Sequence, residues 1–204
     1  MPPLHPSPAT DTVIVSPYSA ESIERKLQNK LTLQEKLGWP PEKKRAMVCI
    51  PTALSEEHGG TLLKTLLPGL LELPIELLIL GKGTKEFGTL LSHIAQEESH
   101  RIAIISNDTA ALRKMYAAAD IALFPCDPAG SPELSFCLRY GVIPIAPLAD
   151  TLENYNPNQE RGCAFLYDPP SAWRCFAALV RALETYRFPF DWRNIQKEAM
   201  RRAH

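Results

Sequence analysis

The fold is decided by residues 113–141, R-K-M-Y-A-A-A-D-I-A-L-F-P-C-D-P-A-G-S-P-E-L-S-F-C-L-R-Y-G. This stretch predicts the end of a helix, a short buried strand over 121–124, a loop over 125–132 and a second helix that stops at Gly141. In an open parallel sheet, the loops that leave the carboxyl ends of the strands form the binding crevice. A helix N-terminus also offers free N–H groups to an anion. We therefore expect a ligand site at the loop over 125–132.

Outward from this stretch, apolar runs of strand length alternate with helical patterns. The predicted strands cover residues 46–51, 75–80, 101–105, 142–146 and 163–166. The predicted helices cover residues 20–37, 61–71, 86–97, 109–119, 133–140 and 171–186. This alternation is typical of a parallel sheet covered by helices on both faces, so the sequence predicts an α/β, Rossmann-like fold.

The two ends of the chain are less regular. Residues 1–11 include four prolines and predict a loose arm, and residues 12–16 predict a short strand. We therefore expect a Pro-rich arm with a short strand over 1–16 and one Rossmann-like domain over 17–204. The last predicted helix, 191–204, is basic and shows little apolar surface. It either packs back on the domain or lacks its natural partner.

Composition limits the possible partners. The 22 Lys and Arg residues nearly balance the 23 Asp and Glu residues, so the chain has no large positive field for nucleic acid or an anionic membrane. No apolar run reaches the roughly 20 residues that a membrane helix needs, and the N-terminus does not resemble a signal peptide. A cytoplasmic protein is the expectation, with neither nucleic acid nor membrane as partner.

The cysteines and histidines do not form a recognisable site. The five cysteines are odd in number, scattered and mostly set in apolar patterns, which predicts reduced core residues. The histidines show no ligand spacing with cysteine or carboxylate residues, so we expect no metal and no cofactor.

Five stretches, in order, resemble the C-terminal lobe of the bacterial glycogen synthase and plant starch synthase family. They are N-K-L-T-L-Q-E-K-L-G at 29–38, L-L-I-L-G-K-G at 77–83, M-Y-A-A-A-D-I-A-L-F-P at 115–125, L-R-Y-G-V-I-P-I at 138–145 and L-A-D-T-L-E-N-Y-N-P at 148–157. The family consists of retaining glucosyltransferases of the two-lobed B architecture that take ADP-glucose or UDP-glucose. The resemblance therefore implies a single lobe of a B-type glycosyltransferase.

The resemblance also shows a departure after the first predicted strand. The family has S-R-L-x-x-Q-K-G there, and its Arg and Lys contact the nucleotide diphosphate. This chain has T-A-L-S-E-E-H-G at 52–59, so Ala53 replaces the Arg and His58 replaces the Lys. Losing one donor that stabilises developing charge costs ~10²–10³ in rate. His58 is the remaining candidate for a phosphate contact, and Glu56 and Glu57 add opposing charge.

A second departure lies in the loop over 125–132. The family reads E-P-C-G-L-T-Q, and the best match is D-P-A-G-S-P-E at 127–133, although this segment is one residue shorter than the family pattern. The resemblance implies catalytic positions at Asp127 and Glu133, and nucleotide contacts at Gly130 and Ser131. Tyr116 matches a position near the nucleotide base and could stack on adenine, but a tyrosine on an amphipathic helix is more often a core residue.

Two hypotheses follow. In the first, the domain is catalytically degenerate and acts as a binding or assembly module for a glucan or a protein partner, at the face where the N-terminal lobe sits in the family. We then expect weak binding of ADP or ADP-glucose at most, and no enzymatic activity from the isolated chain. In the second, the chain is the donor-nucleotide-binding half of an active retaining glucosyltransferase that is completed by an N-terminal lobe.

Overall fold

The computed structural model describes residues 7–169 and 171–203, and it contains one six-stranded parallel sheet. Nearly every strand residue is buried, because helices cover both faces of a parallel sheet. The strands are β1 (Ala46–Ile50), β2 (Ile75–Leu80), β3 (Ile102–Ile105), β4 (Ile121–Leu123), β5 (Ile143–Pro147) and β6 (Phe165–Tyr167). All six lie at or within two residues of the predicted positions, and the predicted α/β fold class is confirmed.

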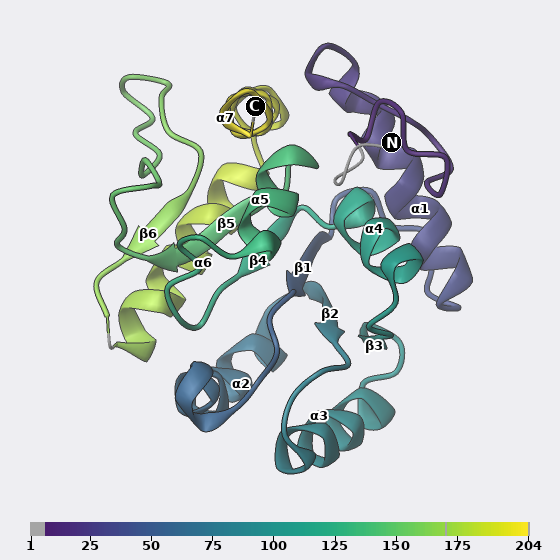
Figure 1. The fold of residues 1–204 in the computed structure, drawn as a ribbon, viewed down its shortest axis with the longest axis vertical. Helices are drawn as coiled ribbons and strands as arrows, with labels where there is room; N and C mark the ends of the chain where they lie inside the picture. The colour runs from purple at the N-terminus through teal and green to yellow at the C-terminus, as the bar shows by residue number, and fades with distance from the viewer. Residues whose placement is uncertain (1–6, 170, 204) are drawn as a thin grey trace.

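Helices lie on both sides of the sheet (Figure 1). The first side carries α1, α4, α5 and α7, where α1 packs on α4 and α5 packs on α7. The second side carries α2, α3 and α6, where α2 contacts α6. The helices are α1 (Lys26–Lys36), α2 (Gly60–Glu72), α3 (Lys85–Glu97), α4 (Thr109–Ala118), α5 (Pro132–Arg139), α6 (Ala172–Tyr186) and α7 (Pro189–Arg202), with short 3₁₀ helices η1 (Ala20–Arg25) and η2 (Glu56–His58). Among the residues that the structure describes, no helix has the length and apolar character needed to span a membrane.

The strand order is β3-β2-β1-β4-β5-β6, so the chain reverses its direction of travel across the sheet between β1 and β4. After β1 the chain moves outward to β2, and after β4 it moves outward to β5 on the other side. Ligands of open α/β sheets bind at the carboxyl ends of the strands beside such a reversal. This topology places the loops after β1 and β4 next to the expected crevice.

The predicted strand over residues 12–16 is wrong, because these residues form bends. Side chains, and not a neighbouring strand, hold this segment. Asp11 is fully buried, accepts hydrogen bonds from the Arg113 guanidinium of α4, and accepts one from the backbone N–H of Val13 at 2.8 Å. The N–H of Ser16 donates to Asn29 Oδ1 at 2.9 Å. Residues 7–16 of the predicted loose arm are therefore anchored, whereas residues 1–6 lie outside the described residues.

The last helix packs back on the domain. Trp192, Ile195, Gln196, Ala199 and Met200 are buried, and α7 contacts α5 and η1. The expectation of little apolar surface is wrong, because four apolar side chains, those of Trp192, Ile195, Ala199 and Met200, recur at helical spacing on the inner face of α7.

Candidate functional site

Three loops meet at the carboxyl edge of β1, β2 and β4. Gly59 has a φ of +79°, and a Cβ atom added to it would lie 2.4 Å from Pro125 Cβ, so the loop after β1 touches the loop after β4. Leu54 bridges to Gly83, and its N–H donates to Lys82 O at 3.1 Å, which joins the loops after β1 and β2. The predicted ligand loop is thus part of a continuous surface built from three strand ends.

His58 is exposed in this surface, at the end of η2. Its Nδ1 lies 2.7 Å from Ser55 Oγ, and its backbone N–H donates to the same oxygen at 3.2 Å. The imidazole is therefore held against its own loop. Only Nε2 remains for a phosphate oxygen, and it can donate one hydrogen bond where a lysine would offer three.

The carboxylate of Glu56, close to His58 in the sequence, is occupied by other side chains. The Glu56 carboxylate accepts from Lys64 Nζ at 2.6 Å and from Thr61 Oγ1 at 2.5 Å, and these contacts lower the pKa of Glu56. Lys64 also pairs with Glu86 at 2.6 Å. Lys64 is therefore held between two carboxylates, and its charge does not compensate for the missing Arg and Lys of the loop over 52–59.

The loop between β4 and α5 uses its polar groups to form a turn. Asp127 is exposed, and its Oδ1 accepts from the N–H of Ala129 at 2.9 Å. Gly130 has a φ of +73° and open space around it. Ser131 caps α5, because its Oγ accepts from the N–H of Leu134 at 3.2 Å, and its own N–H donates to Pro128 O at 2.9 Å.

The last two predicted site residues, Glu133 and Tyr116, differ in how deeply they are buried. Glu133 is half-buried in the first turn of α5. Tyr116 is only 2% exposed, and its ring stacks on Phe136 at 5.5 Å between centroids and 7° between planes. Burial raises the pKa of Tyr116. This packing favours the core interpretation of Tyr116, because the ring lies inside the hydrophobic cluster.

Sequence reasoning missed Thr52, which directly follows Pro51 after β1. Its Oγ1 is buried and has no hydrogen-bond partner among the described residues. A buried hydroxyl normally finds a partner, so Thr52 is a polar group in need of one at the carboxyl edge of β1. The sequence could have indicated Thr52, because it is the first polar residue after a predicted buried strand.

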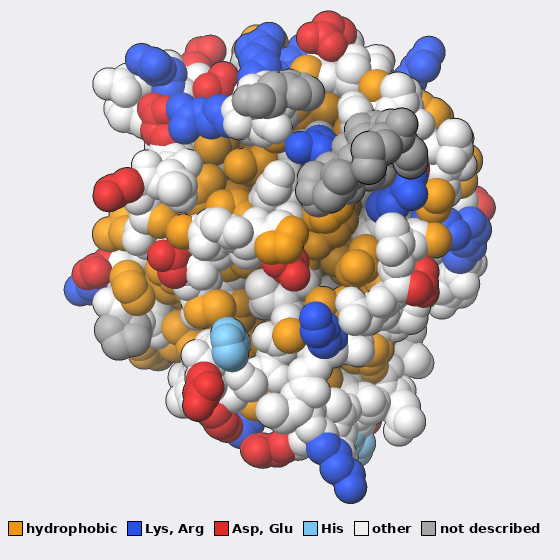
Figure 2. Space-filling view, in the orientation of Figure 1, with side chains coloured by type: hydrophobic (Ala, Val, Ile, Leu, Met, Phe, Trp, Pro, Cys, Tyr) orange, Lys and Arg blue, Asp and Glu red, His pale blue; other side chains and the backbone are white. Residues whose placement is uncertain are grey.

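The candidate site therefore contains carboxylates and one imidazole, but no Arg or Lys at positions 53 and 58. Its polar groups can accept or donate single hydrogen bonds, but they supply little positive charge for a diphosphate. In the space-filling view, hydrophobic side chains gather in the middle of this face and charged ones lie mostly toward its margins (Figure 2). Leu148, just after β5, is 58% exposed.

Comparisons with known proteins agree with this architecture. Glycogen synthase 1 of Synechocystis sp. is 34% identical over 203 residues, which cover 96% of this chain and 42% of the relative. The catalytic domain of starch synthase IV from Arabidopsis thaliana, bound to ADP and acarbose, has a TM-score of 0.81 and 24% identity over 95% of this chain and 42% of its own. No family model matches the chain.

A third comparison concerns an isolated lobe. The C-terminal domain of a glycosyl transferase group 1 family protein from Francisella tularensis matches with a TM-score of 0.63 and 14% identity, over 86% of this chain and 91% of its own. This likeness shows the fold alone. The chain spans about two-fifths of the length of the glycogen synthase that it matches. The chain is therefore homologous, over nearly its whole length, to the C-terminal lobe of the glycogen synthase and starch synthase family.

Proposed function

We propose that this chain is a glycosyltransferase lobe that does not catalyse glucosyl transfer and serves as a binding or assembly module. The observation that carries the proposal is the loop over 52–59, which presents Ala53 and a tethered His58 in place of an Arg and a Lys. Negative charge grows on a nucleotide diphosphate as its bond to the sugar breaks, and preorganised cations stabilise that charge. Without them, ADP or ADP-glucose binds weakly and transfer is slow.

The partner in this proposal is a glucan or a protein at the face where the N-terminal lobe sits in two-lobed relatives. The exposed Leu148 and the hydrophobic side chains in the middle of the view in Figure 2 support such a contact. Apolar groups that gather on a surface are typical of interaction sites.

The test is a calorimetric titration of the purified chain with ADP and ADP-glucose at about pH 6 and pH 8, which lie on either side of the reference histidine pKa of about 6.5. We expect dissociation constants weaker than about 1 mM at both pH values, which corresponds to less than about 4 kcal/mol of binding free energy. The double variant Ala53→Arg with His58→Lys should bind ADP at least about tenfold more tightly, because it restores two cations beside the phosphates.

The matched control adds the same two charges elsewhere, with Thr12→Arg and His93→Lys, both exposed and outside the three loops. It should bind ADP no better than the natural chain. Micromolar binding by the natural chain, weakening from pH 6 to pH 8, would contradict the proposal and assign a working phosphate contact to His58.

The alternative is a donor-binding half of an active enzyme, and one observation favours it. Lys82 is exposed, and its carbonyl accepts from the N–H of Leu54, so a cation stands at the same strand edge. In that case Asp127, Glu133 and Gly130 would act as in the family. Lys82→Ala would then remove ADP binding, and an added N-terminal lobe would produce transfer from ADP-glucose.

A further inference from the structure

A large cavity of about 880 Å³ lies at the opposite edge of the sheet. Its walls include Arg45, Pro74 and Asp120, which directly precede β1, β2 and β4, so the cavity sits at the amino ends of these strands. Residues of η1, α1 and α7 close its sides. The volume falls within the range of small-molecule sites, roughly 300–1,000 Å³. The carboxyl-edge loops described above do not line it.

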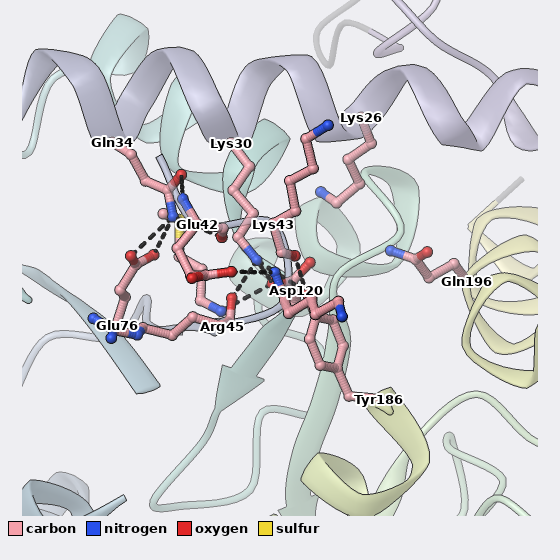
Figure 3. A network of polar contacts seen from close by, with 12 residues as sticks. Lys26, Lys30, Gln34, Glu42, Lys43, Arg45, Glu76, Asp120, Tyr186 and Gln196 are labelled. Carbon is pink, nitrogen blue, oxygen red and sulfur yellow. Dashed lines mark hydrogen bonds and ion pairs between the residues drawn. The ribbon is translucent and has the colours of Figure 1, made fainter. Parts of the chain in front are cut away.

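Two buried lysines in the cavity wall, Lys26 and Lys30, form hydrogen bonds with the rest of the protein (Figure 3). Lys30 Nζ donates to Asp120 Oδ2 at 2.7 Å, to Tyr186 Oη at 2.9 Å and to a backbone carbonyl. Lys26 Nζ donates to the carbonyls of Tyr116 at 2.7 Å and Tyr140 at 3.0 Å, among other oxygens. Both ammonium groups are thus satisfied by the protein and hold α1 against the sheet.

The remaining charges in the wall are mainly positive. Apart from Lys26 and the Lys30–Asp120 pair, five Lys and Arg residues line the cavity against two Glu residues. The ammonium groups of Lys43 and Lys44 make no ion pair among the described residues. The Nε–H of Arg193 donates a hydrogen bond to Pro189 O at 3.0 Å, and the two terminal nitrogens of the guanidinium take no part in this bond. An excess of cations around a concave surface attracts an anion.

Trp192 is only 4% exposed and lines the cavity, and its Nε1–H has no hydrogen-bond partner among the described residues. A buried indole N–H normally meets an acceptor. The rings of Trp192 and Tyr186, together with Ile23 and Leu27, also form an apolar wall. The cavity therefore suits a molecule with an anionic group and an apolar body.

We propose that this cavity binds a small organic phosphate, with the phosphate at Lys43 and Lys44 and the organic part against Trp192. Such a ligand satisfies both the cation excess and the apolar wall. The site is separate from the carboxyl-edge loops, and it does not depend on whether ADP binds there.

The probe is phenyl phosphate, which combines a phosphate monoester with an apolar ring, and inorganic phosphate is the comparison. In a ¹H–¹⁵N spectrum the chain gives three indole signals, because it has three tryptophans, and Trp192→Phe assigns the signal of Trp192. We expect phenyl phosphate to move this signal and to bind at least about tenfold more tightly than inorganic phosphate. Lys43→Glu with Lys44→Glu should weaken binding by at least about tenfold.

The control Lys36→Glu lies near the C-terminal end of α1, is exposed and does not line the cavity. It should change the affinity less than about twofold, which shows the effect of charge alone. The proposal is overturned if phenyl phosphate at a concentration of about 10 mM does not shift the Trp192 indole signal. It is also overturned if inorganic phosphate binds equally well, or if the Lys43 and Lys44 variant binds as the natural chain does.

Discussion

Asp11 is a buried anion that the structure fully satisfies. It is 0% exposed and accepts from Arg113 Nε at 2.9 Å, from Arg113 Nη2 at 2.5 Å and from Tyr140 Oη at 2.5 Å. We expect Asp11→Asn to lower the free energy of unfolding by about 2–4 kcal/mol at pH 7, because Arg113 loses its ionic partner in a mostly buried place. Urea unfolding measures the loss. Asp150→Asn, at an exposed residue, is the control and should change stability by less than about 0.5 kcal/mol.

The same carboxylate predicts a pH dependence. Burial alone would raise the pKa of Asp11, but the hydrogen bonds from Arg113 and Tyr140 outweigh it and lower the pKa. The stabilisation is therefore complete above the unfolded value of about 3.9 and is lost as the pH falls through the lower folded pKa. The difference between the natural chain and Asp11→Asn should shrink below about pH 4. A difference that stays constant from pH 7 to pH 3 would contradict this account.

Gly59 and Gly130 form a matched pair for the contact between the two main loops. Both have positive φ, +79° and +73°, but a Cβ at Gly59 would lie 2.4 Å from Pro125 Cβ, whereas nothing lies within 4 Å at Gly130. Gly130→Ala should cost about 1 kcal/mol for backbone strain alone. Gly59→Ala should cost clearly more, because Pro125 must also move. Equal losses in thermal or urea unfolding would show that the loops after β1 and β4 do not touch.

At the level of elements, α7 is held by its aromatic inner face. Trp192 stacks on Phe165 at 6.4 Å and meets the ring of Tyr186 edge-on at 5.2 Å. We expect Trp192→Ala to lower the free energy of unfolding by about 3–5 kcal/mol, because a large buried side chain is removed. Phe190→Ala, on the same helix but 65% exposed, should cost less than about 0.5 kcal/mol. Similar effects of the two changes in urea unfolding would mean that α7 does not pack as described.

The elements differ in how well their sequence predicted them. All six strands were predicted because each is a short apolar run, and burial on both faces makes such runs easy to recognise. The helix over 20–37 is divided in the structure into η1 and α1, with Ser22 at a non-helical φ of −124° and ψ of 35°. The Oγ of Ser22 accepts from the N–H of Ser19, which is part of a capping box at the start of η1.

For the whole molecule, thiol accessibility tests the fold. All five cysteines are free; four are buried, and Cys126 is half-buried. We expect an aromatic disulfide reagent to label one thiol per folded chain, and all five after denaturation. Burial and the charge of Asp127 raise the pKa of Cys126, so labelling should quicken as the pH rises from 7 to 9. Cys126→Ser should remove the native labelling, and rapid reaction of several thiols in the folded chain would contradict this packing.

The fold class, the strand positions and the kinship with glycogen synthases could be predicted from the amino-acid sequence, because they depend on local apolar patterns and short motifs. The sequence also placed Asp127, Gly130 and Ser131 together, since they are neighbours in one loop. Three contacts could not be predicted in this way and required the three-dimensional structure. Tyr116 packs against Phe136, Lys64 pairs with two carboxylates, and Lys30 of α1 pairs with Asp120, which lies 90 residues later in the chain. Such contacts join residues far apart in the chain, and no local pattern contains the geometry that brings them together.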